Sequence, residues 1–168
     1  MTVMNLKITV KKSIEKSSVL NIRRSDGSTT WSKLHRGMET HDLAHYAVEK
    51  TLHFNKAFYS IIDKGFDISD FELPKDERPK DLQPKHLHPE ALITEHIVNL
   101  LEIEFLNSGF NTNFVTDLKQ ILVDNHLPFP EQLNTETLEI VRTQYHNLVN
   151  QWRCLKNNEE LSVTFITS

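Results

Sequence analysis

The sequence predicts an α+β protein in which an antiparallel sheet of about four strands is packed by three or four helices on one face. Two observations predict this class. Apolar and polar residues alternate near both ends of the chain, whereas the residues between 40 and 157 follow the helical spacing of three and four. The chain is 168 residues long and contains no internal repeat, so we expect one domain over residues 1–168.

Residues 5–34 are expected to form a three-stranded antiparallel meander. Every second residue from Leu6 to Val10 is apolar, as in a strand with one buried face. The Asp-Gly pair at residues 26–27 lies between two β-rich runs and favours a tight hairpin turn. At the other end of the chain, residues 161–167 predict a fourth strand, which most simply returns to the meander.

The middle of the chain predicts helices. Residues 40–64 contain neither glycine nor proline and place apolar side chains on one side, so we expect one long amphipathic helix. Residues 66–88 contain three prolines and no clear period, which indicates an irregular loop that is either a solvated connector or a lid. Residues 89–157 open on a proline and are expected to hold the remaining helices, separated by breaks near Gly109 and at residues 126–130.

Composition restricts the function classes. The chain has 19 basic and 23 acidic residues, a formal net charge of −4, which argues against a nucleic-acid partner held by phosphate neutralisation. No apolar run is long enough to span a membrane and the start lacks the pattern of a signal peptide, so we expect a cytoplasmic protein with no membrane partner. The single cysteine, Cys154, excludes an intrachain disulfide and is expected to be buried and inert.

One group of residues in the first predicted helix can carry chemistry. His41 and His45 are four residues apart and therefore lie on the same helix face, where both imidazoles can bind one cation. Glu49 continues this row by a further turn. The chain has nine histidines, so one pair at this spacing is also common by chance, and the alternative is a pair of helix-border histidines with ordinary hydrogen bonds.

The segment from His41 to His45 resembles the zincin motif H-E-x-x-H, with Asp42 at the glutamate position. This resemblance implies that the two histidines bind zinc and that Asp42 acts as the base toward metal-bound water. Aspartate is one methylene shorter, so its carboxylate would lie about 1.5 Å further back. The longer string HDLAHYAVEKTL, followed by AFYSIIDKGFDI, resembles a group of small bacterial proteins and implies no mechanism.

The second predicted helix is apolar nearly all round, which is typical of a mostly buried helix, but Glu95, Asn99 and Glu102 form one polar stripe on it. This stripe either is the solvent face or points inward at partners. In the second case Glu95 completes a two-histidine, one-glutamate metal set, with Asn99 and Glu102 supporting the ligands. Four further histidines are alternative or additional candidates near the site: His35, His86, His88 and His96.

Three interpretations of function remain open. The first is a small metal-dependent hydrolase of a small-molecule substrate, with zinc as the expected ion and Asp42 or Glu49 accepting a proton from bound water. The second is a module that binds a metal or ligand without chemistry. The third is an interaction or structural protein that forms a homodimer through the apolar stripe of its last helix or through a sheet edge, with incidental histidines.

Overall fold

The structure is a computed structural model that describes residues 4–167, and it has the predicted α+β class. In chain order its elements are β1 (Met4–Lys11), β2 (Val19–Arg23), β3 (Thr29–Lys33), α1 (Met38–Thr51), α2 (Phe58–Asp63), α3 (Ile68–Glu72), the 3₁₀ helix η1 (Lys80–Leu82), α4 (Pro89–Leu106), α5 (Phe114–Asp124), α6 (Thr135–Cys154) and β4 (Glu160–Thr167). Within the described part of the chain, no helix is long and apolar enough to cross a membrane.

The sheet is antiparallel throughout and has the strand order β3-β2-β1-β4. Ile8 of β1 lies opposite Ile22 of β2 on one side and Val163 of β4 on the other. The side chains of Leu6, Ile8 and Val10 are almost fully buried, as their alternation predicts. The predicted meander and the return of the C-terminal strand to it are therefore confirmed.

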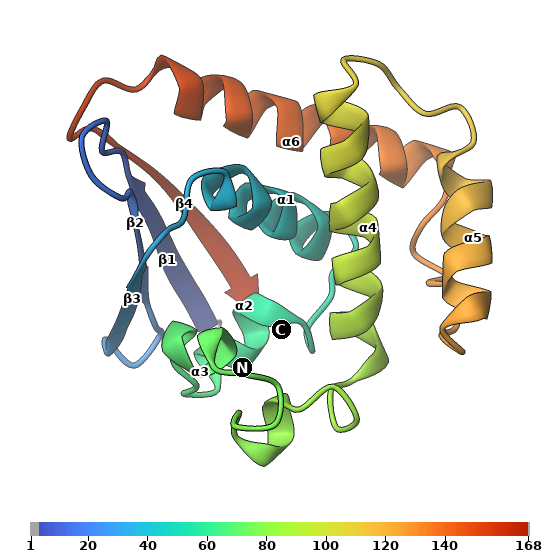
Figure 1. Cartoon of the computed structure of the whole chain (residues 1–168), viewed down its shortest axis with the longest axis horizontal. Coiled ribbons are helices and arrows are strands. Elements are labelled where there is room, and N and C mark those ends of the chain that lie inside the picture. The colour runs from blue at the N-terminus through green and yellow to red at the C-terminus, as the bar shows by residue number, and fades with distance from the viewer. Residues whose placement is uncertain (1–3, 168) are drawn as a thin grey trace.

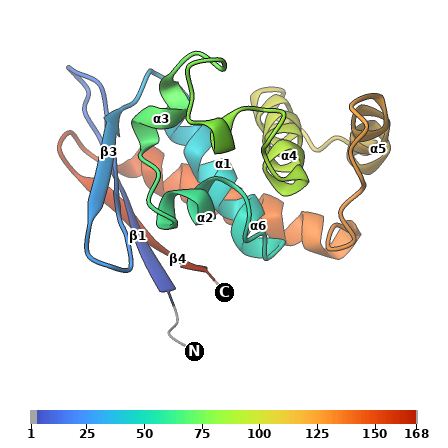
Figure 2. The ribbon, with the colours of Figure 1, turned by 90° about the horizontal axis from the view of Figure 1, so that it is seen from below.

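The helices form two layers on one side of the sheet (Figures 1 and 2). Residues of α1, α2, α3 and α6 share one apolar cluster with the sheet, and α4 and α5 form a second cluster on the far side of α1 and α6. Leu43 and Tyr46 belong to the sheet-side cluster, whereas Ala44, Ala47 and Val48 belong to the outer one. Helix α1 is consequently buried on all sides from residue 42 to residue 49, and it is not the amphipathic surface helix that its sequence indicates.

The prediction of one helix over 40–64 is wrong, because α1 ends at Thr51 and α2 begins at Phe58. His53 adopts the left-handed conformation with φ 54°, and the Phe54 N–H donates to the Glu49 carbonyl at 2.9 Å, which closes the helix end. The Glu49 carboxylate then accepts from the Tyr59 N–H in the first turn of α2. A buried acidic side chain thus links the two helices across the break, and apolar periodicity does not reveal this contact.

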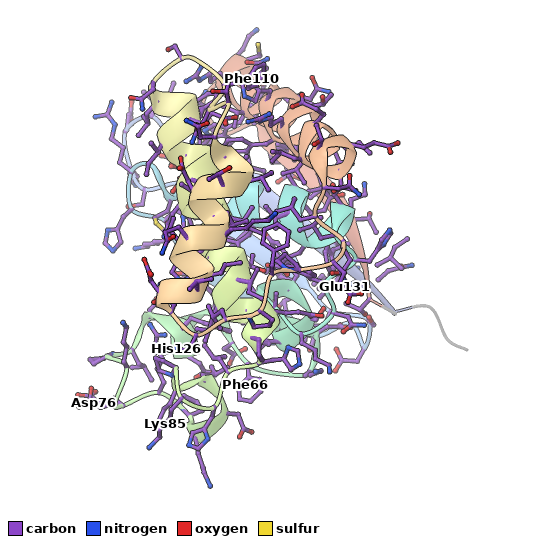
Figure 3. All side chains as sticks on the ribbon, turned by 90° about the vertical axis from the view of Figure 1, so that its right-hand side faces the viewer. Phe66, Asp76, Lys85, Phe110, His126 and Glu131 are labelled. Carbon is purple, nitrogen blue, oxygen red and sulfur yellow. The ribbon has the colours of Figure 1, made fainter. Side chains whose placement is uncertain are left out.

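The segment 66–88, expected to be irregular, contains α3 and η1 and buries Leu82. The buried Arg24 guanidinium fixes its beginning by donating to the Phe66 carbonyl at 2.6 Å and to Asp67 at 2.7 Å. Asp67 and Asp70 in turn cap α3 reciprocally. Figure 3 shows the tip of this segment, marked by Asp76 and Lys85, at the end of the molecule opposite Phe110.

Residues 89–157 form three helices, as predicted. Helix α4 is mostly buried, as expected, with buried residues from Ala91 to Glu104, and it becomes exposed at its C-terminal end, where Leu106 is 79% exposed. The expectation that Cys154 is buried is wrong, because Cys154 is exposed. The apolar stripe of α6 packs into the molecule's own core, so it is not the dimer surface suggested by the sequence; its buried members are Leu138, Val141, Tyr145, Leu148 and Trp152.

Candidate metal centre

Helices α1 and α4 pack side by side and bring the predicted ligands together (Figures 1 and 2). The Nε2 atom of His45 lies 3.2 Å from one oxygen of Glu95, and the Nε2 atom of His41 lies 3.8 Å from the other oxygen. One donor atom from each of the three residues falls within 4.8 Å of the others. Two imidazoles and a carboxylate at this separation form a group that could hold a metal ion.

The Nδ1 atom of each histidine faces a second carboxylate. His45 Nδ1 lies 3.0 Å from Glu49, and His41 Nδ1 lies 3.1 Å from Glu102. An ionised carboxylate only accepts hydrogen bonds, so each Nδ1 must carry the proton. With the proton fixed on Nδ1, the Nε2 atom of each imidazole is the nitrogen that a metal ion would bind.

Glu49 lies behind the His45 ring and has no exposed surface. One of its oxygens accepts from His45 Nδ1 and the other accepts from the Tyr59 N–H at 3.0 Å. Both oxygens are thus engaged, and Glu49 does not line the cavity in front of the ligands. This arrangement does not suit the predicted proton acceptor, and it corresponds instead to a side chain that orients a ligand.

The protonation of each group in the site affects the pKa of its neighbours. Burial by itself lowers the pKa of His45, but the hydrogen bonds to Glu49 and Glu95 outweigh burial and raise this pKa to about 10. Burial opposes ionisation of Glu95 as well, yet the hydrogen bond from His45 holds its pKa below the usual value. Without an ion, a proton on His45 Nε2 therefore lies next to an ionised carboxylate, at a position that a metal dication can take over.

Asp42 lies next to the ligands and is only 7% exposed. Burial raises the pKa of its carboxyl group to about 7, although the nearby His45 and His41 act in the opposite direction. Within residues 4–167 its Oδ2 atom has no hydrogen-bond partner. A buried polar atom without a partner is costly and is uncommon except at functional sites.

A cavity of about 550 Å³ adjoins the site and includes His41, Asp42, His45 and Glu95 in its lining. This volume lies in the range of pockets that bind small molecules. The rest of the wall is mainly apolar and comes from β2, α2, α3 and the start of α4; its members include Leu20, Phe58, Ile61, Ile68, Phe71 and Ala91. Because the Glu95 side chain is 51% exposed, the ligands are accessible from this side.

Asn99 and most of the other histidines lie elsewhere. Asn99 is exposed, and in the described residues it makes no hydrogen bond to His41 or His45, so the structure gives it no supporting role. His88 caps α4 by accepting from the Glu90 N–H at 3.2 Å. His96 lines the cavity without joining the ligand group, and His35 and His86 are exposed outside it.

Sequence reasoning missed Phe58 and Tyr59, which support the site from α2. The Tyr59 hydroxyl donates to the Asp42 carbonyl at 2.8 Å, and its N–H holds Glu49. The Phe58 ring lies 5.7 Å from that of His45. No local pattern signals these contacts, because they depend on the break between α1 and α2.

The chain matches no protein-family model, no curated protein and no solved structure. Fold and site together define an α+β protein with a candidate centre of two histidines and one carboxylate beside an apolar cavity.

Proposed function

We propose that the protein binds a divalent metal ion through His41, His45 and Glu95 and uses it to hydrolyse a small-molecule substrate. The observation that carries this proposal is the repeated carboxylate–histidine arrangement, in which Glu102 and Glu49 each fix one ligand. Such pairs orient metal-binding histidines and raise their basicity. An isolated histidine on a helix border does not need a buried carboxylate behind it.

Zinc is the proposed ion. Two imidazoles, one carboxylate and a remaining position for water form a catalytic zinc set, in which the ion lowers the pKa of the bound water. Ferrous iron accepts the same donor set in oxygenases. The metal must therefore be identified by measurement and not assumed.

Asp42 is the proposed acceptor of the proton from bound water. Its place between the two histidines in the sequence resembles that of the zincin base, and its buried Oδ2 without a partner supports this role. A dication beside the carboxyl group lowers its pKa and favours the ionised form. Glu49 is instead proposed as a positioning residue.

The test of metal binding is the metal content of protein purified without chelator and without a histidine tag. We expect close to one ion per chain in the wild type, a loss in His45→Ala and Glu95→Gln, and retention in the matched control His86→Ala, which alters an exposed histidine. A wild-type protein that binds neither zinc nor iron after incubation with excess ion would falsify the proposal.

Catalysis is tested separately from binding. We expect the zinc-loaded protein to hydrolyse p-nitrophenyl octanoate, an ester with an apolar chain that suits the cavity, and Asp42→Asn to retain the ion but lose most of the rate. Equal rates for wild type, Asp42→Asn and His45→Ala would show that the ion does no chemistry. The protein would then be a binding module.

One observation favours a second candidate function, a homodimer. Three large apolar side chains at the end of α4 and just beyond it are exposed, namely Ile103, Leu106 and Phe110 (Figure 3 labels Phe110). Large exposed apolar patches often mark interaction sites. Light scattering decides this: a dimeric wild type that becomes monomeric in Leu106→Glu supports the dimer, and a monomeric wild type excludes it.

A further inference from the structure

We infer that the cavity binds an anionic amphiphile, whose apolar body lies along the aromatic wall and whose anionic group lies at Lys75 and Arg78. The placement of a metal ion at the other end of the cavity rests on the proposed function. The binding of the apolar body and of the anionic group does not depend on that function, because these contacts involve other residues.

The apolar wall leads away from the ligands toward α3. The Phe58 ring lies 5.7 Å from the His45 ring and 5.0 Å from the Phe71 ring, so two aromatic contacts connect the candidate metal ligand His45 to α3. Ile61 and Ile68 lie beside them in the cavity lining. A surface of this kind favours an apolar ligand body over water.

The charged groups of the cavity outside the ligand site lie where the chain leaves α3. Lys75 and Arg78 line the cavity, as does Glu72. The Glu72 carboxylate accepts a hydrogen bond from Ser32, and the Arg78 Nε–H donates to the Leu73 carbonyl at 2.9 Å, which orients the guanidinium group. No salt bridge to Lys75 or Arg78 is present in residues 4–167, so this rim has two cations available for a ligand anion.

The opposite end of the cavity carries the candidate metal ligands His41, His45 and Glu95 together with the buried Asp42. The cations Lys75 and Arg78 therefore lie at one end of the apolar wall and the candidate metal centre lies at the other. The ligand class that fits this arrangement has an anionic head and an apolar body.

The test uses three probes with the same eight-carbon chain and different heads: octanoate, octan-1-ol and octylammonium. Their affinities are measured by calorimetry on protein freed of metal by a chelator. We expect octanoate to bind roughly 3- to 10-fold more tightly than octanol, and octylammonium to bind most weakly, because exposed ion pairs contribute modestly. High salt should reduce these differences.

Two double variants separate the rim from general surface charge. Lys75→Glu with Arg78→Glu should reverse the order of octanoate and octylammonium. Lys80→Glu with Lys85→Glu makes the same charge change in the same segment at exposed residues outside the cavity lining, and it should keep the wild-type order. In Ala91→Phe, which places a larger side chain in the cavity wall, all three probes should bind at least tenfold more weakly while circular dichroism shows a folded chain.

Three results would overturn the inference: equal affinities of the three probes, an unchanged order in the rim variant, or full binding by folded Ala91→Phe. Octanoate that binds only to metal-loaded protein, whatever the rim charge, would also overturn it, since the carboxylate would then lie on the ion. Metal binding is measured independently. A protein with an ion but no probe binding refutes this inference alone, and a protein with probe binding but no ion refutes only the proposed function.

Discussion

Replacing Glu49 with glutamine tests the support of the metal centre without changing a ligand or the side-chain volume. In the wild type both oxygens accept from N–H donors, one on His45 and one on the backbone of Tyr59, each at 3.0 Å. A glutamine has only one acceptor oxygen. Its NH₂ group must face one of these donors.

The backbone N–H cannot change, so the glutamine oxygen should stay with Tyr59 and the NH₂ group should face His45. His45 Nδ1 then has to accept, which moves the ring proton to Nε2, the nitrogen needed by the metal. Loss of such support typically reduces metal affinity 10- to 100-fold. This corresponds to about 1.4–2.8 kcal/mol.

The assay is competition for zinc against a chromogenic chelator. Glu102→Gln is the matched control, because within residues 4–167 the Glu102 carboxylate forms a hydrogen bond only with the imidazole of His41. Its side chain is partly exposed, so a glutamine can turn its oxygen to the ring. We expect a loss of less than about tenfold in this control. Equal zinc affinities of the wild type and Glu49→Gln would refute the assigned tautomer and the role of Glu49.

Further predictions concern stability and pH. Glu104 accepts from the buried Arg142 through both oxygens, at 2.8 and 2.7 Å, so Glu104→Gln should lower the free energy of unfolding by about 3–5 kcal/mol in chemical denaturation. Glu139 binds the same arginine at the surface, and Glu139→Gln should cost less than about 1 kcal/mol. Since the folded pKa of Asp42 is about 7, above its unfolded value of 3.8, metal-free Asp42→Asn should be more stable than the wild type by up to about 4 kcal/mol near pH 8, and this gain should vanish below about pH 4. An unchanged pH profile of the free energy of unfolding would contradict the burial of that carboxyl group. Zinc at about 100 times its dissociation constant should add about 2.7 kcal/mol to the wild type in thermal unfolding and nothing to Glu95→Gln.

The sequence predicted what depends on short-range regularity. Alternation from Leu6 to Val10 marked a buried strand face, and the polar stripe on an apolar helix pointed to Glu95 and Glu102. Helical spacing placed His41 and His45 one turn apart, which holds wherever the helix lies. These features depend only on residues that are close together in the sequence.

What escaped prediction depends on contacts between distant residues. Just beyond α1, Glu49 accepts from the Tyr59 N–H, and at the start of segment 66–88 the buried Arg24 donates to Phe66 and Asp67. Asn99 shares the polar stripe, yet it lies outside the site because the contact between α1 and α4 decides which members of the stripe face the histidines. The cavity likewise arises from several elements and has no local signal.

Helix α1 contributes residues to both of these apolar clusters, whereas α4 contributes to the outer one. An ion bound between these helices would act as a crosslink between the inner and outer layers. Separation of α4 from α1 would then remove Glu95 from the ion, so a bound ion would oppose detachment of the outer layer. Amide hydrogen exchange in α4 should accordingly slow when the ion is present.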